Sequence, residues 1–195
     1  MKKQFVVAFL FSIVLSACNN HPKNNNEEEK ITVKKNFFRV NDFIKSEIGY
    51  VDSLPLAIIK YNIDNNKTDS VFIKPPAFNI IAQAFISDAL ISPSFEENFT
   101  ENSFMDEATQ SVTFTYSAKK NIGELRHVDV LVKPTPGLNK VKSIYMEKII
   151  NKNDTLIIKK MIWKARRNLT IITSIQPLGQ KAVINQTKIV WDDRD

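Results

Sequence analysis

The sequence predicts an α+β fold in which two short helices pack on one face of an antiparallel β-sheet. Segments with helical apolar spacing occur only before residue 91, and a period of two takes over from Thr109 onward. Short turns separate the segments of this second part, and short turns join antiparallel neighbours. The chain has 195 residues, 43% of them apolar, which is enough for one domain of ordinary size.

The first half of the predicted domain, which we take as residues 37–195, begins with a helix and a hairpin. Residues 41–51 have the spacing of an amphipathic helix that starts at Asn41, a favourable N-cap residue. The stripe of this helix consists of Phe43, Ile44, Glu47, Ile48 and Val51. Residues 56–63 and 70–74 are strand-like, and the turn chemistry of the residues between them predicts a hairpin.

A second helix is predicted over residues 77–90, directly after Pro75 and Pro76, because proline is favoured at the start of a helix. Its core-facing stripe consists of Phe78, Ile81, Ala82, Phe85, Ile86 and Leu90. Residues 91–108 contain Pro93 and four glutamates, so we expect a long acidic loop there.

Six strands are predicted in the second half, at residues 112–116, 128–132, 141–150, 155–164, 169–176 and 182–191. Apolar and polar residues alternate in the first two, as in a sheet with one face in the core. Because each turn is short, the expected sheet is an antiparallel up-and-down meander, which could curve into a half-barrel. The helices are expected to cover one of its faces.

Residues 1–17 have the features of an export leader. Lys2 and Lys3 give it a positive start, and residues 5–15 form an apolar run of 11 residues. A run of this length is too short for a transmembrane helix, which needs about 20 residues. The leader ends in Leu15-Ser16-Ala17, and Cys18 follows.

This tetrapeptide resembles the lipobox of bacterial lipoproteins, which the lipoprotein signal peptidase recognises. The resemblance implies that the thiol of Cys18 receives a diacylglyceryl group, that residues 1–17 are removed, and that the new amino terminus is acylated. Cys18 is the only cysteine in the sequence, so a disulfide is excluded within the chain. Each buried methylene contributes about 0.8 kcal/mol, so two or three acyl chains would anchor the protein firmly.

Residues 18–36 are predicted to be the lipidated cysteine and a disordered tether. Residues 19–30 contain no apolar residue beyond Pro22, and as a flexible coil the tether would reach about 23 Å. In the enterobacterial sorting rule, aspartate after the cysteine retains a lipoprotein in the inner membrane. Asn19 therefore favours the outer membrane, and whether the domain faces the periplasm or the cell surface stays open.

Charge is distributed unevenly along the chain. Residues 41–118 hold 11 acidic and 4 basic residues, whereas residues 119–191 hold 4 acidic and 15 basic residues. A basic region can meet nucleic acid, anionic lipid or an acidic partner, or can face the acidic half of its own fold. For an exported protein we expect lipid headgroups or the protein's own acidic half, and no nucleic acid.

The sequence predicts no catalytic, cofactor-binding or metal-binding residues. His127, with Asp129 nearby, is the only histidine of the predicted domain, and a half-exposed strand residue is the favoured interpretation. Asp64, Asn66 and Thr68 match the start of a calcium loop, but the glycine and glutamate that complete such a loop are missing. The carboxylates of the expected acidic loop are interpreted as solvated: Glu96, Glu97, Glu101, Asp106 and Glu107.

Many basic residues also lie in the predicted meander, interleaved with Trp163 and Trp191. We interpret the basic residues as the solvent face of the sheet. They are Lys142, Lys148, Lys159, Lys160, Lys164, Arg166, Arg167, Lys181 and Lys188. Three acidic-hydroxyl-apolar triplets resemble the O-glycosylation acceptor of Bacteroidota, and their hydroxyl residues are Ser53, Ser70 and Thr155. Together with the leader, these features make the chain similar to the small lipoproteins of that phylum.

The expected protein is a monomeric, membrane-anchored envelope lipoprotein whose domain binds rather than catalyses. The first hypothesis is a scaffold or interaction module that meets envelope proteins through the outer face or an edge of its sheet. The second is a carrier of lipid or another apolar ligand, similar in fold to lipocalins and to the envelope's lipoprotein carriers. A hydrolase ranks last. A filled core would favour the first, and an apolar cavity above about 300 Å³ the second.

Overall fold

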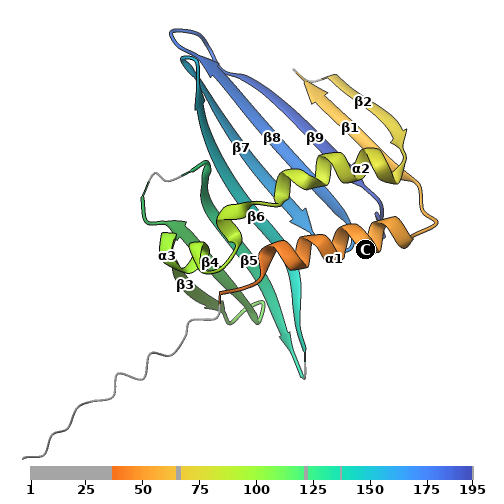
Figure 1. Cartoon of the computed structure of the whole chain (residues 1–195). Coiled ribbons are helices and arrows are strands. Elements are labelled where there is room, and N and C mark those ends of the chain that lie inside the picture. Colours follow the sequence, from red (N-terminus) through yellow and green to blue (C-terminus); the bar gives the residue numbers. More distant parts are fainter. Residues whose placement is uncertain (1–36, 65–66, 121–122, 137, 195) are drawn as a thin grey trace, which may run out of the picture. The chain divides into compact units, whose positions relative to one another are not determined.

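The computed structural model describes residues 37–64, 67–120, 123–136 and 138–194 (Figure 1). Its helices are α1 (Val40–Ser53), α2 (Pro75–Ala82) and α3 (Ser94–Asn98), and the 3₁₀ turns η1 (Gln83–Phe85) and η2 (Asp88–Leu90) link α2 to α3. The strands are β1 (Ile58–Asp64), β2 (Lys67–Ile73), β3 (Phe99–Asp106), β4 (Ser111–Ala118), β5 (Leu125–Thr135), β6 (Leu138–Lys152), β7 (Thr155–Lys164), β8 (Asn168–Pro177) and β9 (Val183–Val190).

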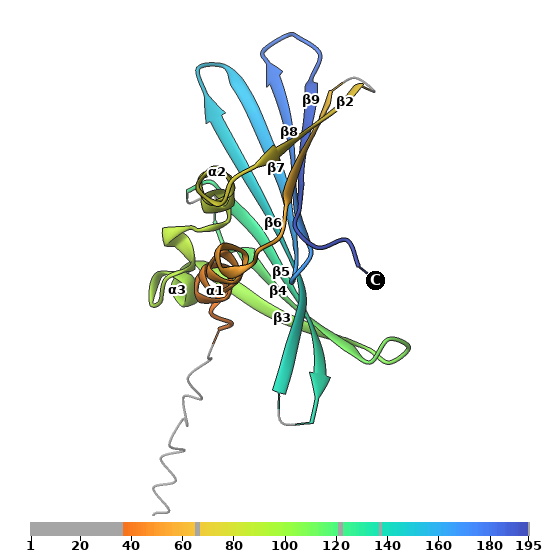
Figure 2. The same cartoon turned by 90° about the vertical axis from the view of Figure 1, so that its right-hand side faces the viewer.

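In the described part of the chain these strands form one antiparallel sheet in the order β2-β1-β9-β8-β7-β6-β5-β4-β3. Strands β3 to β9 follow one another as a meander, and the β1–β2 hairpin adds to it beside β9. The sheet is open, with β2 and β3 as its two edges. The α+β class, the hairpin and the six predicted strands of the second half are thus confirmed, on a curved sheet (Figure 2).

All three helices lie on one face of the sheet, which we call the helix side; the opposite face is the outer face (Figure 2). The core between helices and sheet is built around Trp163 of β7, which is fully buried. Its ring centroid lies 5.2 Å from that of Phe85, 6.2 Å from that of Phe78 and 5.5 Å from that of Trp191. These edge-to-face and tilted contacts are favourable for aromatic rings and fix α2 and η1 over β7.

A buried carboxylate fixes α1 to the same region. Glu47, which is 2% exposed, accepts hydrogen bonds from the indole Nε1 of Trp163 (3.3 Å) and from the backbone N–H of Arg166 (2.7 Å). The Arg166 Nε lies 3.0 Å from the other carboxylate oxygen, and the guanidinium stacks 3.7 Å above the ring of Tyr50. Glu47 thus joins the middle of α1 to the β7–β8 turn.

Asn41 is not the N-cap, contrary to the sequence prediction. The helix α1 begins at Val40, and Asn41 is its buried second residue. Its side-chain amide donates to the carbonyl of Ser87 (2.8 Å) and accepts from the N–H of Ser87 (3.2 Å). Asn41 thus fixes the start of α1 to the segment between η1 and η2. The predicted second helix ends early, at Ala82, and continues only as the turns η1 and η2.

The prediction of a long acidic loop over residues 91–108 is wrong. This segment contains α3 and the edge strand β3, and the buried residues Phe95 and Phe99 attach it to the core. The ring centroid of Phe95 lies 4.8 Å from that of Tyr116 and 5.2 Å from that of Phe99. Most side chains of β3 are exposed, since the strand has a single neighbour, so its sequence lacks the apolar alternation of an inner strand.

Candidate binding surfaces

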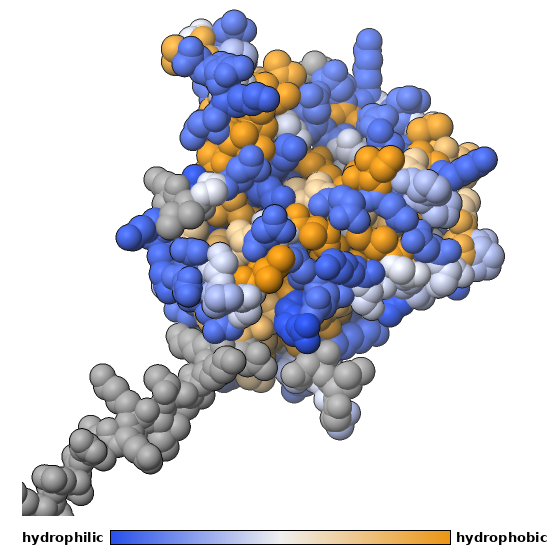
Figure 3. Space-filling view, viewed as in Figure 1, coloured by the Kyte–Doolittle hydropathy of each residue, from blue (hydrophilic) through white to orange (hydrophobic). Residues whose placement is uncertain are grey.

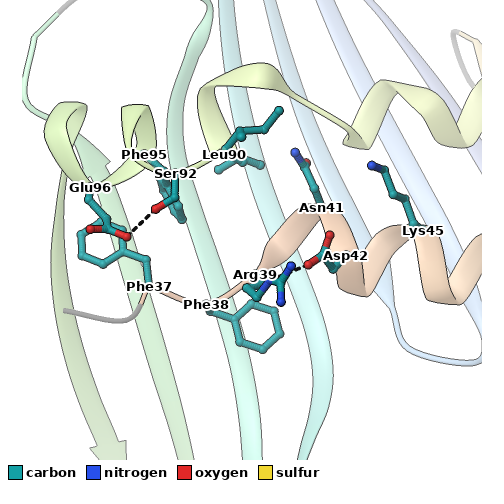
Figure 4. Close-up of a pocket in the computed structure, with 11 residues that line it drawn as sticks. Phe37, Phe38, Arg39, Asn41, Asp42, Lys45, Leu90, Ser92, Phe95 and Glu96 are labelled. Atoms are coloured by element: carbon teal, nitrogen blue, oxygen red, sulfur yellow. Dashed lines mark hydrogen bonds and ion pairs between the residues drawn. The ribbon is translucent and has the colours of Figure 1, made fainter. Parts of the chain in front are cut away.

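A groove of about 510 Å³ opens between the start of α1 and the η2–α3 segment (Figure 4). Three of its charged side chains interact with neighbours on their own segments: Arg39 with Asp42, and Glu96 with Ser92. Such local pairs between exposed groups hold side chains in place but contribute little stability. The groove is lined by Phe37, Phe38, Arg39, Asn41, Asp42, Lys45, Leu90, Ile91, Ser92, Phe95 and Glu96.

A second groove, of about 750 Å³, lies beside β1 and the ends of β8 and β9. Ile59, Tyr61 and Val190 lie on the outer face of the sheet and contribute apolar surface to it. Asp192 and Arg194 border it, and hydrogen bonds from the side chain and backbone of Arg194 lower the pKa of Asp192 to about 2. A hollow with an apolar floor and a charged rim suits a protein surface better than a reaction, because polar groups do not converge on one point.

A third surface lies on the helix side, where β6 to β9 extend beyond α2 (Figure 1). We call it the distal surface, and it consists of Lys148, Ile150, Ile157, Lys159, Thr173, Ile175, Val183 and Asn185. Val183 is 49% exposed, and the isoleucines are half-buried. In the space-filling view, hydrophobic and hydrophilic residues are interspersed over the helix-side face of the molecule (Figure 3).

His127 lies on the outer face, between Ser117 of β4 and Glu147 of β6. Its Nε2 is 2.9 Å from a carboxylate oxygen of Asp129, which also accepts a hydrogen bond from Thr115 (2.6 Å). The hydroxyl of Ser117 lies 3.5 Å from Nδ1. The half-exposed strand histidine with Asp129 on the same face agrees with the sequence interpretation.

This Ser-His-Asp row lacks what acyl transfer needs. The strand β4 lies between β3 and β5, so the backbone N–H groups around Ser117 belong to the sheet ladders. A nucleophile also requires donors for the developing oxyanion. The 3.5 Å contact between Ser117 and His127 is at the limit of a hydrogen bond. The row is better explained as cross-strand pairing on a solvated sheet face.

We predict that His127→Ala lowers the free energy of unfolding by about 1 kcal/mol, because the half-exposed contact with Asp129 and some sheet coverage are lost. Function should persist when a deletion strain is complemented with this variant. Ser117→Ala is the matched control and should behave in the same way. Complete loss of function at normal abundance and with an unchanged melting curve would overturn the non-catalytic interpretation.

The lysines of the meander divide between the two faces, so only some of them form the predicted solvent face. Lys160, Lys164 and Lys188 lie on the outer face, whereas Lys148 and Lys159 face the helix side. The ammonium of Lys148 donates to the carbonyl of Ala84 (2.7 Å), and burial lowers the pKa of this lysine. The sequence interpretation did not distinguish these two groups, because it did not establish which face of each strand the helices cover.

The carboxylates of the mispredicted loop are spread over three elements. Glu96 and Glu97 lie on α3, Glu101 and Asp106 on β3, and Glu107 in the β3–β4 turn. Asp106 accepts hydrogen bonds from Thr109, which lower its pKa. In the described ranges, no three His, Cys, Asp or Glu side chains gather in a way that could hold a metal ion.

The three predicted glycosylation acceptors lie on three different elements of the structure. Ser53 ends α1 and donates to the carbonyl of Tyr50 (2.7 Å), Ser70 is exposed on the edge strand β2, and Thr155 starts β7. Cys18 lies outside the described residues, as do the tether and Asn66 of the rejected calcium loop. Among the described helices, none is both long and apolar enough to span a membrane.

Comparison with known proteins gave no matching family model, no curated relative and no matching solved structure.

Proposed function

We propose that this protein is a lipid-anchored envelope protein whose folded domain is a non-catalytic binding module. The observation that carries the proposal is the apolar surface that the helices leave uncovered on a rigid sheet. Exposed aliphatic residues occur on both faces of β9: Val183 on the helix side is 49% exposed, and Ile184 on the outer face is 57% exposed. On the helix side, Val183 continues a row of half-buried aliphatic residues, Ile175, Ile157 and Ile150, and contiguous apolar surface of this kind marks interaction sites.

The packing between helices and sheet supports a binding module over a carrier. A carrier would hold its apolar ligand in a cavity roofed by the helices. In this chain the space is occupied by fully buried side chains, among them Trp163, Phe78 and Phe85. A ligand could enter only if these rings moved, and each such ring contributes several kcal/mol to stability when buried.

The anchor is proposed from the leader and from the lipobox at Leu15 to Cys18. With residues 18–36 as a flexible tether, the domain would lie at an r.m.s. distance of about 23 Å from its anchoring point. Such tethering raises the effective concentration of any partner held at the same membrane, so modest affinity suffices.

Photo-cross-linking in the source cells tests the binding proposal. The photoreactive residue p-benzoylphenylalanine replaces Val183, Ile184 or, as control, Phe104. Phe104 is 69% exposed, but it lies on the edge strand β3 at the other end of the sheet. We expect specific adducts from β9, at Val183, Ile184 or both, and none from Phe104. Adducts from neither β9 position, or equal adducts from all three, would refute the binding module.

A further inference from the structure

The distal surface consists of two rows of side chains that run across four strands. In one row, Lys148 of β6 faces Lys159 of β7, and the row continues through Thr173 and Asn185. In the next row outward, Ile150 faces Ile157, and the row continues through Ile175 and Val183. One row is therefore polar and basic, and the other is wholly aliphatic.

The helix α2 forms one wall of this surface. Its residue Asn79 donates to the carboxylate of Asp52 on α1 (3.0 Å), so this side of α2 faces α1. Ala77, Ile81 and Ala84 lie on the opposite side of the α2–η1 segment at helical spacing. The bond from Lys148 to the backbone carbonyl of Ala84 shows that the η1 end of this segment borders the distal surface.

The dimensions of the surface fit one more helix. Helices pack with their axes about 8–10 Å apart. Residues on the same face of a strand are about 6.7 Å apart. Phe78 and Phe85 place α2 over Trp163, and the next helix-side residues of β7 are Met161, Lys159 and Ile157. Along β7, Lys159 lies about 13 Å and Ile157 about 20 Å from Trp163, so the two rows lie beyond α2 and together provide the width of one helix.

The width of the surface sets the length of that helix. The four strands β6 to β9 span about 14 Å at the usual strand spacing. This distance corresponds to roughly 10 helical residues. An acyl chain fits less well, because a shallow surface would leave half of it in water, whereas a helix presents its own polar side to solvent.

Charge indicates what that helix must carry. Lys148 and Lys159 are direct cross-strand partners, and like charges in this position repel. Glu124 is a nearby carboxylate that favours the charged form of Lys148, whereas burial and Lys159 act against it. Carboxylates from a partner would relieve the repulsion between the two lysines.

We propose that the distal surface binds an amphipathic helix of a partner protein, with an aliphatic stripe on Ile150, Ile157, Ile175 and Val183 and carboxylates beside Lys148 and Lys159. This inference rests on the proposed binding function and names the surface and the kind of partner. The bound helix would extend the layer of α1 and α2 across the rest of the sheet (Figure 1).

The cross-linking experiment tests this proposal when the adducts are sequenced. We expect the Val183 adduct to join an acidic, amphipathic helical segment of about 10 residues or more. Adducts only at Ile184 would preserve the binding module and refute this surface. A phospholipid or fatty-acid adduct at Val183 would refute the helical partner.

A matched pair of charge reversals on β7 supplies the second measurement. Lys159→Glu should reduce the Val183 adduct about tenfold, whereas Lys160→Glu, on the outer face of the same strand, should leave it unchanged. Melting curves of both variants establish that the fold is intact. Replacing an acidic residue of the sequenced partner segment by lysine should restore cross-linking between that partner and the Lys159→Glu variant. Equal losses in both variants, or no restoration, would overturn the proposal.

Discussion

Glu47→Ala should lower the free energy of unfolding by about 3 kcal/mol. The substitution leaves the buried indole N–H of Trp163 and the backbone N–H of Arg166 without their acceptor. Each orphaned donor costs about 1–3 kcal/mol when water cannot reach it. The ion pair itself contributes less, because the Arg166 side chain is 49% exposed.

Chemical denaturation measures this effect, and two variants control it. Glu47→Gln retains one side-chain acceptor and should lose about half as much stability. Asp42→Ala removes the exposed carboxylate that pairs with Arg39, the N-cap residue of α1, and it should change stability by less than about 0.5 kcal/mol. Equal losses from Glu47→Ala and Asp42→Ala would show that the buried network does not fix α1 to the sheet.

Glu47 illustrates what the sequence can and cannot predict. Helical spacing correctly placed it on the stripe of the first helix with Ile44 and Ile48. A carboxylate on a buried stripe needs a partner. That partner, Arg166, is 119 residues away and sits in a turn with a positive φ of 62°, so no local pattern connects the two residues.

Edge and surface features were predicted less well than inner strands. The inner strands β4 to β9 have one face in the core, which imposes alternation that a sequence reveals. The edge strand β3 does not, and it was mistaken for a loop. The distal surface was hidden for another reason: the lysines were visible, but only the position of α2 determines that Lys148 and Lys159 flank an uncovered stretch of sheet.

The second prediction with a large effect concerns the anchor. Cys18→Ser should abolish incorporation of an alkyne-labelled fatty acid, because a serine hydroxyl cannot replace the thiolate that accepts the diacylglyceryl group. The leader should then remain uncleaved, since cleavage at a lipobox follows lipidation in the lipoproteins that this leader resembles.

The readout for Cys18→Ser has to be the lipid label together with the mass of the chain. An uncleaved leader retains its apolar residues 5–15, so the variant could still sediment with membranes although no acyl chain is attached.

Asn20→Ser is the matched control: it introduces the same residue two positions later and should leave labelling and cleavage intact. Two or three acyl chains bind a bilayer firmly, at about 0.8 kcal/mol per buried methylene, so the wild-type protein should resist extraction by salt or alkali. Persistent label on Cys18→Ser would place the lipid on another residue and refute Cys18 as the site of the anchor.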